Sequence, residues 1–220
     1  MRNIERSLVP ALLAGALLLG ACSRTPSAND DPDLVAESLG GEFLLTGDDG
    51  RPVALADFRG RMVLLFFGYT ACPDICPTTL SRIGRAYSLL AKEGIARADV
   101  QTLFITVDPA RDTPDKIRKY LTYFGVNAIG ATGTVAEIEK VAKRYGAAFW
   151  REEEPASAAG YLMSHSTSIY LIDRGGTVRH IFDFEDPPER IAELVERLAN
   201  ADCCTSKPKA IAGGPVPNPL

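Results

Sequence analysis

The stretch that most constrains the fold is a run of six apolar residues, Met62 to Phe67, followed by a turn carrying Cys72 and Cys76. An unbroken apolar run of this length predicts a strand that is buried on both faces. Behind the turn, apolar residues recur at helical spacing and predict a helix over 78–93. The two thiols therefore lie where a central strand leads into a helix N-terminus. There, unpaired N–H groups and the helix dipole favour a thiolate over a thiol.

The N-terminus has the pattern of a secretory leader. Arg2 and Arg6 precede an apolar run over 8–19, which is too short to span a bilayer comfortably. The run ends in Leu-Gly-Ala-Cys at 19–22, which resembles the bacterial lipoprotein processing box, so Cys22 is the expected site of lipidation. The alternative is an ordinary signal peptide followed by an incidental cysteine.

These features divide the chain into a signal peptide (1–21), a flexible tether (22–38), one folded domain (39–200) and a disordered tail (201–220). No second long apolar run exists, so the sequence predicts attachment to a membrane by an anchor. The formal net charge is only −4 and no basic block is present, so nucleic acid is not an expected partner.

The five cysteines do not form the pattern of a disulfide-stapled domain. One lies at the lipoprotein box, two form the pair at 72 and 76, and Cys203 and Cys204 are adjacent near the C-terminus. The fold must then depend on a hydrophobic core, which leaves Cys72 and Cys76 for chemistry. Three roles are open for Cys203 and Cys204: accessory metal ligands, a redox pair, or incidental thiols of a disordered tail.

Strands and helices alternate through the middle of the sequence. A hairpin is expected over 42–55, then strands over 62–67 and 100–107, helices over 113–124 and 134–146, a hairpin over 168–182 and a helix over 189–199. The stretch 128–132 fits a strand or a loop. The pattern predicts an α/β fold whose central mixed sheet is flanked by helices, with an N-terminal hairpin, and this order of elements is similar to the thioredoxin fold.

Three sequence blocks make the resemblance more specific. They are Gly-Tyr-Thr-Ala-Cys-Pro-Asp-Ile-Cys-Pro at 68–77, Val-Asp-Pro-Ala-Arg-Asp-Thr-Pro at 107–114, and Tyr-Leu-Met-Ser-His-Ser at 161–166. In this order they resemble the Sco/SenC family of copper-binding proteins, over roughly 39–198. The resemblance implies a thioredoxin-like, membrane-tethered domain that binds copper and serves assembly of cytochrome c oxidase. Carried over by position, it implies that the metal ligands are Cys72, Cys76 and His165.

The residues themselves are compatible with this ligand set. Two cysteines four apart at the start of a helix lie on one face, so both sulfurs can reach one ion. Thiolates favour Cu(I) and imidazole suits both oxidation states of copper, so Cu(I), Cu(II) or both are expected. Zinc would accept the same groups but usually takes a fourth ligand in a structural site.

Two histidines are present, and a lone histidine is more often an ordinary polar residue than a ligand. His165 precedes the strand expected at 168–172, and in a thioredoxin fold that junction faces the cysteine turn. His180 falls in an alternating strand pattern. Asp74 is expected to stabilise the helix N-terminus. Asp108 and Asp112 are expected to shape their loop and the start of the next helix.

The sequence supports two functions of different classes. The first is a membrane-anchored copper chaperone on the periplasmic side of a bacterial envelope, whose partners would be the copper-bearing subunit of cytochrome c oxidase and other periplasmic copper carriers. The second is an envelope thiol–disulfide oxidoreductase that uses Cys72 and Cys76 as a redox pair without metal. Thioredoxin-like reductases place a cis-proline before the strand at 168–172, whereas Thr167 stands there. The enzyme is therefore the less favoured function.

Overall fold

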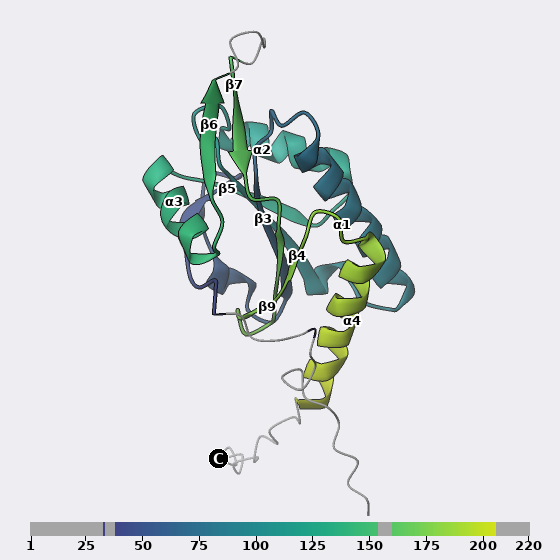
Figure 1. Ribbon diagram of the computed structural model, residues 1–220. Helices are drawn as coiled ribbons and strands as arrows, with labels where there is room; N and C mark the ends of the chain where they lie inside the picture. Colours follow the sequence, from purple (N-terminus) through teal and green to yellow (C-terminus); the bar gives the residue numbers. More distant parts are fainter. Residues whose placement is uncertain (1–32, 34–37, 154–159, 206–220) are drawn as a thin grey trace, which may run out of the picture.

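The computed structural model describes residue 33 and residues 38–153 and 160–205, with the backbone alone for 202–205 (Figure 1). The predicted signal peptide, Cys22 and most of the tether lie outside the described residues, as does 206–220. The described strands are β1 (Leu44–Gly47), β2 (Pro52–Ala54), β3 (Met62–Gly68), β4 (Val100–Thr106), β5 (Ala128–Thr132), β6 (Phe149–Glu153), β7 (Tyr161–His165), β8 (Ile169–Ile172) and β9 (Val178–Phe182). The helices are α1 (Ile75–Lys92), α2 (Pro114–Leu121), α3 (Val135–Arg144) and α4 (Pro188–Thr205).

A seven-stranded mixed sheet forms the centre of the domain, in the order β2-β1-β5-β4-β3-β8-β9. Strands β3, β4 and β5 are parallel to one another, while β1 and β8 run antiparallel to their neighbours. The N-terminal hairpin β1–β2 extends this sheet at the β5 edge. The predicted α/β, thioredoxin-like fold with a mixed central sheet is confirmed.

Strand β3 is buried on both faces, as its unbroken apolar run predicts. Met62, Leu64 and Phe66 pack into the core on the side of α1, α2 and α4. The residues between them pack into the core on the α3 side. Helices α1 and α4 pack against each other on one face of the sheet and α3 covers the other (Figure 1). The central strand therefore provides a rigid base for the turn that follows it.

Helix α1 begins three residues earlier than predicted, at Ile75 instead of Thr78. Pro77 lies in its first turn, where a missing backbone N–H costs nothing because that group has no partner within the helix. Cys76 is consequently a residue of the first helical turn, whereas Cys72 lies in the preceding loop. The two thiols therefore meet because the loop folds back, and not because both lie on one face of a helix.

The helix starts expected at Thr113 and Thr134 are confirmed. The Thr113 hydroxyl accepts the backbone N–H of Lys116, with proline at the first helical position. At α3, Thr134 and Glu137 form a reciprocal capping box, in which each side chain accepts the backbone N–H of the other residue.

Two C-terminal features differ from the expected pattern. Tyr161–His165 forms strand β7, which the sequence did not predict, and pairs with β6 in a separate two-stranded sheet. Its side chains are all partly exposed, so it lacks the apolar alternation that marks a strand. Helix α4 continues to Thr205 instead of ending at Ala199, since no glycine or proline interrupts the intervening residues.

Candidate metal centre

The turn after β3 places both cysteines at the N-terminus of α1. The thiol of Cys76 is buried with 1% of the residue exposed, while Cys72 is partly exposed. The backbone N–H of Cys72 donates to the carbonyl of Tyr69 at 3.2 Å, which folds the loop back. In this position the Cys72 Sγ accepts the backbone N–H of Cys76 at 3.4 Å. An otherwise unpaired N–H at the helix N-terminus thus stabilises a negative charge on Cys72.

Gly68, the last residue of β3, provides the space that Cys76 needs. A Cβ atom at this position would lie 2.9 Å from the Cys76 Sγ and 2.9 Å from the Phe104 ring. Any larger residue would therefore force the thiol or the ring to move. The glycine before the cysteine turn is explained by close packing at the site.

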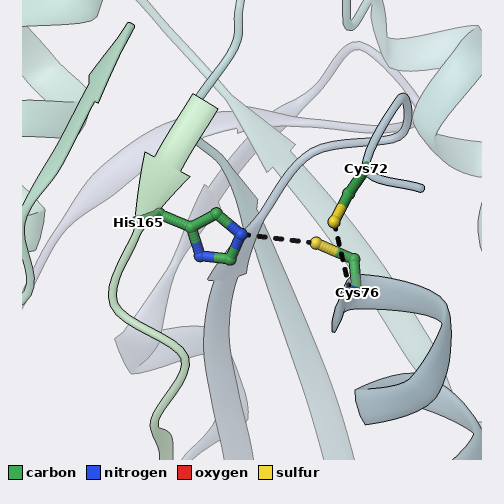
Figure 2. A group of neighbouring side chains, drawn as sticks. All are labelled: Cys72, Cys76 and His165. Carbon is green, nitrogen blue, oxygen red and sulfur yellow. Dashed lines mark hydrogen bonds between the residues drawn. The ribbon is translucent and has the colours of Figure 1, made fainter. Parts of the chain in front are cut away.

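His165 reaches the cysteines from the end of β7 (Figure 2). Its Nε2 lies 3.6 Å from the Cys76 Sγ, and the ring packs edge to face with Tyr69 at a centroid distance of 5.8 Å. The ligand atoms of Cys72, Cys76 and His165 all lie within 4.8 Å of one another. The structure thus brings His165 to the cysteine pair, although Cys76 lies 89 positions before it in the sequence.

The backbone selects the tautomer of His165. Its Nδ1 lies 2.9 Å from the carbonyl oxygen of Ser166, which can only accept a hydrogen bond. In the neutral ring the proton is therefore on Nδ1, and the Nε2 lone pair faces the sulfurs. In a typical histidine ligand, one ring nitrogen donates a hydrogen bond to a carbonyl oxygen and the other ring nitrogen binds the metal.

The two thiols differ in acidity: Cys72 loses its proton readily, whereas Cys76 keeps its proton. The hydrogen bond from the Cys76 thiol, helped by the backbone N–H of Cys76, lowers the pKa of Cys72 to about 3 against the opposing effect of burial. The same hydrogen bond and burial raise the pKa of Cys76 far above its usual value. At neutral pH the pair is thus one thiolate and one thiol, and binding a metal through both sulfurs releases the Cys76 proton.

Alkylation of Cys72 is expected to depend only weakly on pH. Because the pKa of this thiol is depressed to about 3, its thiolate persists as the pH falls and is lost only near that value. The rate with iodoacetamide should change by less than about 2-fold between pH 8 and 5, whereas the rate of an ordinary thiol falls roughly several hundred-fold. Peptide mass spectrometry measures this, with urea-unfolded protein as the control. A steep decline in the folded protein would contradict the shared-proton arrangement.

Other residues considered from the sequence do not belong to the Cys-Cys-His cluster. His180 is in β9 and its Nδ1 lies 2.9 Å from the backbone carbonyl oxygen of Asp33, as fits an ordinary strand position. Asp74 is the residue before α1, where its carboxylate accepts the Thr78 hydroxyl at 3.4 Å. Cys203 and Cys204 lie in the last turns of α4, where only the backbone is described.

In the part of the chain that the structure describes, the Cys-Cys-His group is the one cluster of three or more Cys, His or acidic side chains with metal-ligand spacing. Two sulfurs and one imidazole form a soft donor set that favours Cu(I) and also suits Cu(II). An open groove beside it is lined by Cys72 and His165 together with Asp74, Trp150, Glu152 and Thr167, among others. The arrangement can hold a metal and leave it accessible to another protein.

Fold and site together define a thioredoxin-like protein with a cluster of two thiols and one imidazole that could hold a soft metal. Residues 32–200 match the SCO1/SenC family model, and the chain belongs to this family. It is 34% identical over 188 residues to a SCO2-like protein of Rickettsia felis, covering 83% of this chain and 89% of the relative.

Solved structures agree with this assignment. Bradyrhizobium japonicum ScoI with copper bound is 37% identical, with a TM-score of 0.62 and coverage of 73% of this chain and 99% of that one. A SCO1/SenC family lipoprotein from Bacillus anthracis is 26% identical, with a TM-score of 0.63 and coverage of 74% and 97%. The resemblance inferred from the three sequence blocks is confirmed.

Proposed function

We propose that this protein binds copper through Cys72, Cys76 and His165 and delivers it during assembly of the dinuclear copper site of cytochrome c oxidase. The observation that carries the proposal is the convergence of two sulfurs and an imidazole Nε2 within 4.8 Å. Copper is supported by the softness of this donor set and by the copper-bound state of the solved ScoI relative. The copper-bearing subunit of the oxidase and other periplasmic copper carriers are the proposed partners.

The proposed location is the periplasmic side of a bacterial envelope, with the domain held to the membrane by lipid on Cys22. The lipoprotein-like residues at 19–22 and the lipoprotein description of the Bacillus anthracis relative support this. Residues 1–21 would be removed and 22–38 would form the tether of the domain 39–200. Of the tail expected over 201–220, the first five residues belong to the end of α4. Among the described helices, none combines the length and apolar character needed to cross a bilayer. Mass spectrometry of the protein isolated from membranes tests the lipid.

Changing His165 to Ala tests the proposed ligand set. Loss of the imidazole removes one of three ligands, so we expect copper affinity to decrease by at least about 10-fold, the lower bound seen for changes around metal sites. The position of the sulfur-to-copper charge-transfer absorption should also shift. Copper titration of the full chain against a competing chelator measures both. His180→Ala is the matched control, since that ring lies on β9 outside the cluster.

A thiol–disulfide oxidoreductase is the second candidate, favoured by the low pKa of Cys72 beside a buried partner thiol. Thr167 lines the groove at the cysteines, where the sequence of thioredoxin-like reductases has a proline. The reduction potential of the pair and turnover on a disulfide-bonded target peptide separate the two functions. Catalytic turnover by metal-free protein would favour the enzyme, and its absence would favour the chaperone.

A further inference from the structure

The loop 107–112 between β4 and α2, here called the bracing loop, contacts both segments that carry the proposed ligands. Its last residue, Asp112, is buried with 1% exposed. The Asp112 carboxylate accepts the backbone N–H of Thr70 at 2.9 Å and the Thr70 hydroxyl at 2.5 Å. It also accepts the Thr106 hydroxyl at 2.7 Å. Because Thr70 lies two residues before Cys72, a buried carboxylate fixes the cysteine turn to the end of β4.

The same loop holds strand β7 through Tyr161. The Tyr161 hydroxyl donates to Asp108 at 2.8 Å, and Asp108 is itself buried with 3% exposed. Arg111 pairs with Asp108 and donates to the Tyr161 carbonyl at 3.0 Å. Its guanidinium also stacks over the Tyr161 ring, 3.6 Å from the centroid. One tyrosine is therefore held at its hydroxyl, ring and backbone, at the start of the strand that ends in His165.

These contacts matter because β7 pairs with β6 alone and does not belong to the seven-stranded sheet. The backbone hydrogen bonds of the central sheet thus fix β3, which leads into the cysteine turn, but they do not include the strand that carries His165. At its His165 end the hairpin is closed by the backbone hydrogen bond from Ser166 to Ala148 at 2.9 Å. Besides the short connection 166–168 to β8, side chains hold β7 relative to α1, and the bracing loop provides the charged and buried ones described above.

We propose that Asp108, Arg111 and Asp112 are positioning residues for copper. From one loop, they fix the position of the imidazole relative to the two sulfurs. Asp112 acts through Thr70 on the cysteine turn, whereas Asp108 and Arg111 act through Tyr161 on the histidine strand. The proposal rests on the copper site proposed above. Partners that orient metal ligands typically change metal affinity 10- to 100-fold when they are lost.

The histidine half of the brace is tested by Tyr161→Phe, which removes the hydrogen bond to Asp108 but keeps the ring under Arg111. In the full-length protein in mild detergent, copper should be lost to a chelator about 10-fold faster. The nitrogen hyperfine coupling in the electron paramagnetic resonance spectrum of the Cu(II) form should weaken or become heterogeneous. Tyr145→Phe is the matched control, because it removes another tyrosine hydrogen bond, to Gly41 at 3.2 Å, away from the site.

The cysteine half is tested by Thr70→Val, which keeps the backbone hydrogen bond to Asp112 and removes only the hydroxyl. We expect weaker sulfur-to-copper charge transfer with the nitrogen coupling retained, the opposite pattern to Tyr161→Phe. Thr70→Ser, which restores the hydroxyl, should restore the spectrum. This pair of variants keeps the test independent of Asp112 itself, whose replacement in a buried network risks unfolding.

A double variant separates this proposal from the function on which it rests. If Tyr161 acts through His165, Tyr161→Phe adds no further loss of copper once His165 is Ala. Rates within 2-fold of wild type for Tyr161→Phe, or an equal effect of Tyr145→Phe, would overturn the brace. If His165→Ala itself leaves the copper spectrum unchanged, the ligand set fails instead.

Discussion

Cys76→Ser is expected to weaken copper binding by at least about 100-fold and to remove most of the sulfur-to-copper absorption. Cys76 supplies one of the two sulfurs of the proposed ligand set. A serine hydroxyl neither ionises near neutral pH nor offers a soft donor to Cu(I). Loss of a direct ligand should exceed the 10- to 100-fold cost of losing an orienting partner.

Competition titration with a chelator of known affinity measures this effect, and circular dichroism checks the fold. Cys203→Ser and Cys204→Ser are the matched controls, since they make the same chemical change in the last turns of α4. They should keep affinity within about 2-fold, because the proposed site already has its ligands. Equal loss in the controls and in Cys76→Ser would place the copper elsewhere.

Phe104→Ala is expected to destabilise the domain by about 3–5 kcal/mol, the range for removing a buried aromatic side chain. Phe104 is fully buried in the middle of β4. Its ring packs edge to face with Phe66 at a centroid distance of 5.2 Å and lies 6.0 Å from the ring of Tyr120. The side chain therefore supports both the central strand and the packing beside Gly68 and Cys76.

Urea unfolding of the metal-free protein measures the change, with Tyr123→Ala as control because that side chain is 83% exposed. The control should change stability by less than about 0.5 kcal/mol. Copper should restore part of the loss, since a ligand at 100 times its Kd stabilises the folded state by about 2.7 kcal/mol. A loss below about 1 kcal/mol for Phe104→Ala would show that this core does not support the site as described.

Local patterns in the sequence predicted most of the fold because its central elements follow simple rules. The apolar run in β3, the capping box at Thr134 and the proline after Thr113 each correspond to the element that they indicated. The start of α1 was misplaced because prolines normally mark breaks, yet Pro77 is tolerated in a first turn. Strand β7 was missed because its half-exposed side chains carry no periodic signal.

The site was predictable as a set of residues but not as an arrangement. The sequence blocks indicated Cys72, Cys76 and His165, whereas their approach depends on contacts between distant segments. The hydrogen bonds from Thr70 to Asp112 and from Tyr161 to Asp108 span 42 and 53 positions of the sequence, and no local sequence pattern predicts them. The same holds for the packing of Tyr69 against His165. The only sequence signal for these contacts is that the residues lie within the three blocks that carry the family resemblance.

In the proposed site, one copper ion is held by both sulfurs and the imidazole. X-ray absorption spectroscopy of the copper-loaded full chain, compared with His165→Ala, tests it most directly. We expect two sulfur neighbours and one imidazole nitrogen for the wild type, and loss of the imidazole scattering in the variant. A wild-type spectrum with sulfur neighbours alone, or one that His165→Ala leaves unchanged, would contradict it.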